Sequence, residues 1–74
     1  MTKLNQIERG HTVRVVSIED GAIGRRLVEM GLFPGRQISM VRRAPLQDPI
    51  EFTVGESCLS LRECEAQLVA VEEI

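Results

Sequence analysis

The sequence has few or none of several residue types, and it lacks the long apolar stretches that membrane and secreted proteins contain. It has no Trp, no Tyr and only two Phe, so its core must be built almost entirely from aliphatic side chains. No run of about 18 apolar residues is present, which excludes a membrane-spanning helix. The first residues contain no apolar stretch of the kind that secretory signal peptides carry. We therefore expect a cytosolic protein without membrane insertion.

Cysteine and histidine are also scarce. The 74 residues include two cysteines, Cys58 and Cys64, and one histidine, His11. A structural zinc site needs about four close ligands, which these three residues cannot supply. A cytosolic setting favours reduced thiols over a disulfide, so both cysteines are expected to pack as small apolar residues. The alternative hypothesis is a metal sensor or carrier that uses these residues or the acidic C-terminal half.

The motifs of common enzyme classes are missing as well. The sequence has no GxxxxGK[ST] phosphate loop, no GxGxxG fingerprint, no GxSxG elbow and no HExxH motif. A chain of this size also leaves little room for a deep pocket. We predict that the protein is not an enzyme and needs no cofactor.

One stretch of the chain specifies a short helix and a tight turn. Apolar residues recur at helical spacing and predict one stripe, formed by Ile23, Leu27 and Met30. Asp20 is suited to cap the start of this helix, and Gly31 is suited to end it in a left-handed conformation. The segment Phe33-Pro34-Gly35-Arg36 then predicts a type II turn, because proline and glycine occupy its second and third positions.

The remaining segments have the short, alternating patterns of β-strands. Strands are predicted at residues 12–18, 37–43, 50–54, 57–61 and 68–72. A bulge is expected near Val16, where the apolar alternation changes phase, and Gly55-Glu56 predicts a hairpin. One helical turn is expected within residues 62–66. Because a flat sheet would expose long edges, we predict an all-β barrel of five to six strands, forming one domain over residues 1–74.

Charge is distributed unevenly along the chain. Residues 1–43 carry eight Lys and Arg against four Asp and Glu, whereas residues 44–74 carry one Arg against seven acidic residues. One interpretation is two solvated faces of the barrel. The other is a basic surface that docks on an acidic partner, formed by Arg25, Arg26, Arg36, Arg42 and Arg43. The net charge of −2 and the lack of stacking aromatics argue against binding to nucleic acid.

An apolar segment follows the predicted helix. Leu32, Phe33 and Pro34 either fold back onto the end of the barrel or form an exposed tip flanked by arginines, a composition typical of protein contacts. We take the second interpretation as the candidate partner-binding surface, which comprises Arg25, Arg26, Leu32, Phe33, Pro34 and Arg36. The apolar turns also leave the formation of a homo-oligomer open.

Taken together, these motifs resemble those of the FeoA family of ferrous-iron-transport proteins. The resemblance covers nearly the whole chain and rests on the order and spacing of separate motifs. These are Gly10, Arg26-Leu27 with Met30-Gly31-Leu32 and Pro34-Gly35, the Pro45…Asp48-Pro49 loop, Leu59-Ser60-Leu61-Arg62 with Glu65-Ala66, and Val69…Val71. The resemblance implies an SH3-like small β-barrel with one inserted α-helix and a short helical turn before the last strand.

The resemblance also implies a function. Members of the family are small cytosolic proteins that work with FeoB, a membrane ferrous-iron transporter with a cytosolic GTP-binding domain. The family is further associated with transition metal ions. The same domain resembles the C-terminal module of iron-dependent transcriptional repressors, in which a DNA-binding domain precedes it. No helix-turn-helix pattern is present here, so a free-standing accessory protein that contacts FeoB is the favoured hypothesis.

Overall fold

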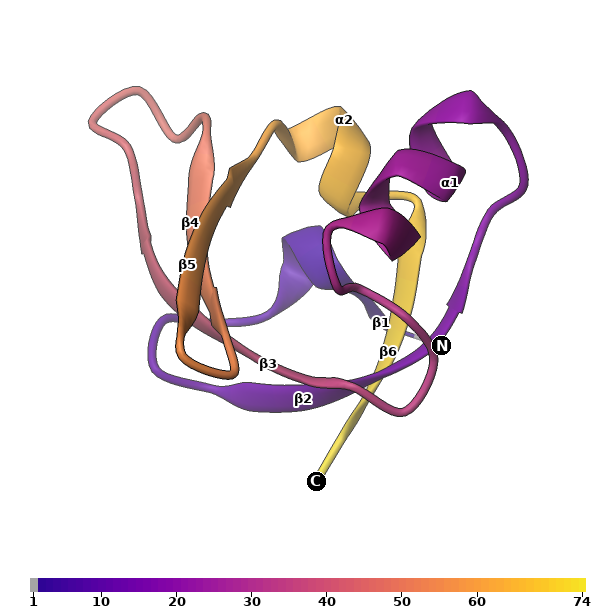
Figure 1. The fold of residues 1–74 in the computed structure, drawn as a ribbon. Helices are drawn as coiled ribbons and strands as arrows, with labels where there is room; N and C mark the ends of the chain where they lie inside the picture. Colours follow the sequence, from indigo (N-terminus) through magenta and orange to yellow (C-terminus); the bar gives the residue numbers. More distant parts are fainter. Residues whose placement is uncertain (1) are drawn as a thin grey trace.

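The fold, described here from a computed structural model for residues 2–74, is a single curled antiparallel sheet with short helices in the segments that connect its strands (Figure 1). The elements in chain order are β1 (Thr2–Lys3), the 3-10 helix η1 (Leu4–Gln6), β2 (Thr12–Ile18), α1 (Ala22–Glu29), β3 (Gln37–Arg43), β4 (Ile50–Val54), β5 (Ser57–Leu61), α2 (Glu63–Ala66) and β6 (Val69–Glu73). The strands pair in the order β1-β6-β2-β3-β4-β5. The predicted all-β barrel, with an inserted helix and a helical turn before the last strand, is confirmed.

The strand predictions agree closely with the structure. Four of the five predicted strands have the expected bounds, and β6 begins and ends one residue later than predicted. The register of β2 against β6 shifts between Val15 and Ser17, which confirms the bulge expected near Val16. A second shift, between Met40 and Arg42 on β3, was not predicted. Strand β1 and helix η1 were also not predicted, because so few residues carry no periodic pattern.

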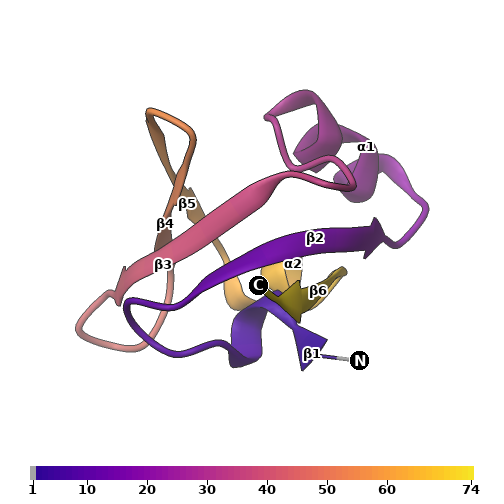
Figure 2. The ribbon, with the colours of Figure 1, turned by 90° about the horizontal axis from the view of Figure 1, so that it is seen from below.

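The view from below shows how the sheet curls (Figure 2), and the buried apolar residues of its strands form one core cluster. Alternate residues of the strands face inward, and Phe52 is the largest side chain that is fully buried. All other core residues are aliphatic or methionine, as the composition predicted. Leu4 and Ile7 reach this core from the N-terminal segment, where each is less than a tenth exposed.

The buried face of helix α1 differs from the predicted one. Its buried residues are Gly24 and Leu27, whereas Ile23 and Met30 are 45% and 44% exposed. The prediction of an inward stripe is therefore wrong for Ile23 and Met30. A Cβ on Gly24 would lie 2.1 Å from the carbonyl oxygen of Glu19, so the glycine lets the helix backbone approach the preceding loop closely.

The start of α1 also differs from the prediction. The N-cap is Gly21, with φ +133°, and no side chain caps the helix. Asp20, the expected cap, is exposed and one residue too early. Neither α1 nor any other helix within residues 2–74 has the length and apolar character that crossing a membrane requires.

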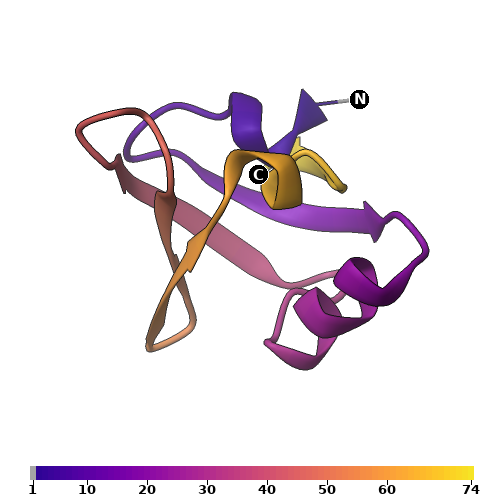
Figure 3. The same cartoon turned by 90° about the horizontal axis from the view of Figure 1, so that it is seen from above.

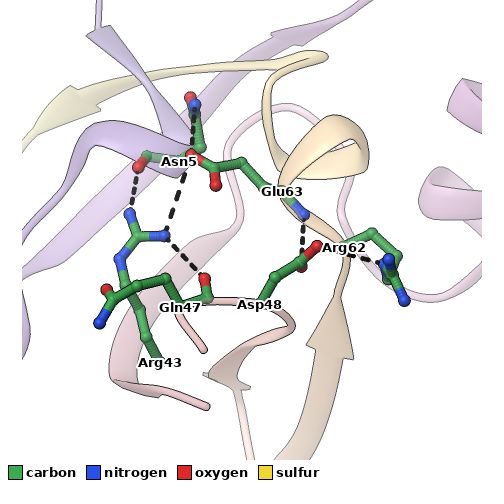
Figure 4. Close-up of polar contacts among 6 residues, drawn as sticks. All are labelled: Asn5, Arg43, Gln47, Asp48, Arg62 and Glu63. Carbon is green, nitrogen blue, oxygen red and sulfur yellow. Dashed lines mark hydrogen bonds and ion pairs between the residues drawn. The ribbon is translucent and has the colours of Figure 1, made fainter. Parts of the chain in front are cut away.

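A network of polar contacts joins segments that are distant in the sequence (Figure 4). The guanidinium of Arg43, at the end of β3, donates to the carbonyl oxygens of Asn5 and Gln47 and lies 4.0 Å from a carboxylate oxygen of Glu63. Asp48 accepts a 2.9 Å hydrogen bond from the Glu63 amide. The network links the β3–β4 loop to η1 and α2, which directly follow the two edge strands β1 and β5 in the chain.

Candidate partner-binding surface

The end of α1 is fixed by a glycine and two backbone hydrogen bonds. Gly31 adopts φ +108° and donates from its amide to the carbonyl of Val28 at 3.0 Å. The Leu32 amide donates to the carbonyl of Leu27, also at 3.0 Å. These two bonds form a Schellman motif, the usual termination of a helix at glycine. The predicted role of Gly31 is confirmed.

The segment from Phe33 to Arg36 forms the predicted type II turn. The Arg36 amide donates to the Phe33 carbonyl at 3.0 Å, and Gly35 has φ +93°. The turn is also tied to β2, because the Gly35 amide donates to the Val15 carbonyl at 2.8 Å and the Arg36 carbonyl accepts from the Val15 amide at 2.9 Å. Phe33 and Pro34 are therefore presented by a well-anchored backbone.

Phe33 and Arg36 form a contact pair on this turn. Phe33 is 42% exposed and Arg36 is half-buried, and the guanidinium carbon of Arg36 lies 5.4 Å from the centroid of the Phe33 ring. Such a cation–π contact contributes about 0.5–1 kcal/mol at an exposed site. Pro34 beside them is also exposed. The turn thus offers an apolar tip with a cation attached.

Leu32 does not belong to this exposed tip. Its side chain is 0% exposed and lies in the core with Leu27, which is also fully buried. A Schellman motif usually packs the residue after its glycine against the last turn of the helix, and Leu32 occupies that position. The expectation that Leu32 takes part in an exposed contact surface is wrong.

The two arginines of α1 differ in whether they form an ion pair. Arg25 and Arg26 both face solvent, as predicted. Arg26 forms an ion pair and hydrogen bond with Glu65 on α2, a contact across 39 positions that no local sequence pattern signals. Within residues 2–74, Arg25 has no ion-pair partner within 4.0 Å. Arg25 is therefore the α1 cation most available to a partner.

The basic first half and the acidic second half of the sequence form ion pairs with each other in the fold. Arginines of the first half bridge to acids of the second half in the pairs Arg14–Glu72 at 3.2 Å, Arg42–Glu51 at 3.0 Å and Arg43–Glu63 at 4.0 Å. The hydrogen bond and charge of Glu51 raise the pKa of Arg42 above its ordinary value. The basic surface expected around Arg25, Arg26, Arg36, Arg42 and Arg43 is therefore smaller than predicted. Of these five arginines, only Arg25 and Arg36 lack a carboxylate partner among residues 2–74.

The candidate metal ligands do not come together. Cys58 lies on β5 and Cys64 on α2, and both are free and exposed, so the expectation that they pack as apolar residues is wrong. His11 lies 3.9 Å from a carboxylate oxygen of Glu8 and 3.7 Å from one of Glu73. Within residues 2–74, no group of three or more Cys, His, Asp or Glu is placed to hold a metal ion.

Comparison with known proteins identifies the family. A family model described as the FeoA domain matches residues 2–73. The chain belongs to the FeoA family. Over 73 residues it is 33% identical to a protein of Porphyromonas gingivalis that is described as a fusion of Fe(2+) transport protein A and the Fe(2+) transporter FeoB. The match covers 97% of this chain but only 9% of that much longer relative.

Solved structures of FeoA proteins share the fold. Iron(II) transport protein A of Clostridium thermocellum is 36% identical with a TM-score of 0.92, over 99% of this chain and 46% of that one. FeoA of Stenotrophomonas maltophilia, described as an SH3 domain protein and complexed with zinc, is 31% identical with a TM-score of 0.88, over 97% and 91% of the two chains. The SH3-like fold that the sequence resemblance implied is confirmed.

The second resemblance, to metal-dependent repressors, extends to the fold alone. A manganese-dependent transcriptional repressor superposes with a TM-score of 0.87 over 99% of this FeoA-family chain, but it is 19% identical and the match covers 41% of that protein. The descriptions of the FeoA relatives from P. gingivalis, C. thermocellum and S. maltophilia name iron transport.

Proposed function

We propose that this FeoA-family chain is a cytosolic accessory protein of ferrous iron uptake that acts by contact with a FeoB-type membrane transporter. The observation that carries the proposal is the fusion protein of P. gingivalis, in which a segment 33% identical to this chain shares one polypeptide with FeoB. Two proteins that are fused in one organism often contact each other where they are separate. The exposed, anchored turn after α1 is consistent with a binding role.

The proposed contact surface is the turn after α1 together with the outer face of α1. Phe33 and Pro34 supply apolar area, and Arg25 and Arg36 supply cations without internal carboxylate partners. Arg26 lies at the edge of this surface, where Glu65 already neutralises its charge. Aromatic residues and arginine are the side chains that most often dominate the free energy of a protein interface. The surface therefore suits an acidic partner segment with an apolar residue.

The test is binding of the purified chain to the cytosolic part of the FeoB-type transporter from the same organism. Phe33→Asp removes the apolar contact and places a carboxylate beside Arg36, and Arg25→Glu reverses the free cation. Each substitution is expected to weaken binding about tenfold or more, the effect of losing an interface anchor worth more than about 1.4 kcal/mol.

Two control variants match these changes away from the proposed surface. Leu46 is 90% exposed on the β3–β4 loop, which lies at the opposite corner of the molecule from α1 (Figure 3), so Leu46→Asp should bind like the unmodified protein. Arg9→Glu matches the charge reversal at another exposed arginine. If folded Phe33→Asp and Arg25→Glu proteins bind as tightly as these controls, the contact surface is elsewhere.

Direct metal binding is the alternative function, and the zinc complex of S. maltophilia FeoA is the observation in its favour. That complex is a property of the relative. In this chain His11 and the two cysteines are dispersed, and residues 2–74 contain no group of three potential ligands. Because divalent transition metals are held by three or four converging side chains, the geometry favours the accessory role.

A further inference from the structure

A hollow on the outer face of the sheet combines an unpaired cation with a row of hydroxyl groups. It has a volume of about 290 Å³ and is lined by Thr12, Arg36, Gln37, Ser39, Thr53 and Gly55. Among the described residues that line it, none is acidic. Every lining side chain can donate a hydrogen bond, apart from Gly55, which has no side chain.

The hydroxyl groups are aligned by the register of the strands. Ser39 on β3 is directly opposite Thr12 on β2 and Thr53 on β4. The hydroxyl oxygens of Thr12 and Ser39 are 2.6 Å apart. Side chains at directly opposite positions have Cβ atoms about 4.5–5.5 Å apart, so the three hydroxyl groups form one row across three strands.

The guanidinium of Arg36 is held beside this row. It stacks on the Phe33 ring, with its central carbon 5.4 Å from the ring centroid. It also passes over Gly55 at the β4–β5 hairpin, where a Cβ would lie 2.5 Å from a terminal guanidinium nitrogen. The absence of a side chain at Gly55 therefore leaves the space that the guanidinium occupies.

The donors of Arg36 are not used within the fold. Among residues 2–74, no carboxylate lies within 4.0 Å of its guanidinium, and the side chain takes part in no recorded hydrogen bond. Arg14, Arg26, Arg42 and Arg43 each have a carboxylate partner instead. A positioned guanidinium with free donors next to several hydroxyl groups is the arrangement that recognises an oxyanion.

We propose that this hollow binds a phosphoryl group. A phosphoryl group offers three terminal oxygens, which can accept from the two-pronged guanidinium and from more than one hydroxyl group at once, whereas a carboxylate offers two. The group can belong to free phosphate or to a phosphorylated molecule. This site goes beyond the proposed transporter contact, although Arg36 borders both surfaces.

The test uses the complete chain, labelled with ¹⁵N and titrated with inorganic phosphate while sodium chloride keeps the ionic strength constant. We expect saturable shifts of the amide signals of Ser39, Thr53 and Gly55. Arg36→Gln should weaken binding about tenfold or more, because it removes the charged donor of the hollow. Ser39→Ala should weaken it less, since two hydroxyl groups remain.

Arg25→Gln is the matched control. It removes one positive charge from another arginine without a carboxylate partner, and it lies outside the hollow, so phosphate binding should be unchanged. Equal loss in Arg25→Gln and Arg36→Gln, or the same shifts with chloride alone, would overturn the proposal. Acetate that binds as tightly as phosphate would overturn the assignment to a phosphoryl group.

The source of the group is resolved by comparing inorganic phosphate with O-phosphoserine and glycerol 3-phosphate. Tighter binding of O-phosphoserine supports a phosphorylated side chain, tighter binding of glycerol 3-phosphate supports a lipid headgroup, and equal binding supports recognition of the phosphoryl group alone. An Arg25→Glu protein that loses the transporter but keeps phosphate separates this site from the contact surface. No transporter is present in the titration, so failure here leaves the proposed function standing.

Discussion

Adjacent residues after α1 have opposite roles, although both are large and apolar. Leu32 is fully buried against Leu27, whereas the Phe33 ring is 42% exposed beneath Arg36. The difference follows from the Schellman motif, because its geometry directs the residue after Gly31 toward the helix and leaves the next residue outside. Leu32 is thus a core residue that holds the turn in place, and Phe33 is the residue that a partner can reach.

We predict that truncation of these two residues affects stability very differently. Leu32→Ala should lower the free energy of unfolding by about 2–5 kcal/mol, because it leaves a cavity in the core. Phe33→Ala should lower it by about 1 kcal/mol or less, since it removes mainly an exposed cation–π contact. Urea denaturation followed by circular dichroism measures both values. Equal losses would show that Phe33 is also a packing residue.

At the scale of the element, α1 is positioned by a close backbone approach at Gly24 together with the burial of Leu27, the only fully buried member of its apolar stripe. Gly24 faces the loop after β2, and its missing side chain allows the helix to approach the Glu19 carbonyl. The stripe of Ile23 and Met30 is consequently left near half exposure. This exposed apolar edge adjoins the outer face of α1, which is part of the proposed contact surface.

Gly24→Ala tests this account of α1. Alanine raises intrinsic helix propensity by about 0.8–1.0 kcal/mol relative to glycine, so a freely exposed helix would gain stability. Here the new Cβ would lie 2.1 Å from a backbone oxygen, and relieving such overpacking costs about 1–3 kcal/mol. We expect a net fall in melting temperature. Arg25→Ala, one position along the helix, should melt near the unmodified protein, and a stabilised Gly24→Ala would contradict the close approach.

The elements differ in how far the sequence predicts them. Strands β2, β3, β4 and β5 were predictable because each buries one face and so alternates in polarity. The turn at Phe33–Arg36 was predictable because only glycine readily takes the conformation at its third position. The burial of Leu32 could have been inferred from the position after Gly31, but the orientation of α1 could not. That orientation depends on a contact between Gly24 and Glu19, which periodicity does not record.

At the scale of the whole molecule, strand pairing among residues 2–74 does not close the sheet. Its edge strands are β1 and β5. The polar network of Arg43, Asn5, Gln47, Asp48 and Glu63 joins the helices that follow these strands, η1 and α2, to the end of β3 and the loop after it (Figure 4). These residues come from four separate parts of the chain. No local pattern links them, which is also why the pairing of first-half arginines with second-half acids could not be foreseen from the sequence.

Two adjacent arginines allow the network to be tested against an ordinary surface ion pair. Arg43 is about one quarter exposed, with side-chain exposure of 23%, and donates to two carbonyl oxygens, whereas Arg42 is 61% exposed and pairs only with Glu51. Arg43→Ala should lower the free energy of unfolding by about 1–3 kcal/mol, because it leaves the partly buried carbonyl of Asn5 without its charged donor. Arg42→Ala should leave stability close to that of the unmodified protein, since exposed pairs contribute little.

Urea denaturation compares the two variants, and amide hydrogen exchange shows where the molecule opens. In Arg43→Ala the amides of η1 should exchange faster than in Arg42→Ala, because η1 loses its link to β3 and to the loop that follows it. Arg43→Lys should fall between, as it keeps the charge but not the planar, multiple donation. Equal stability in the two alanine variants would mean that buried apolar contacts alone hold the edges of the sheet together.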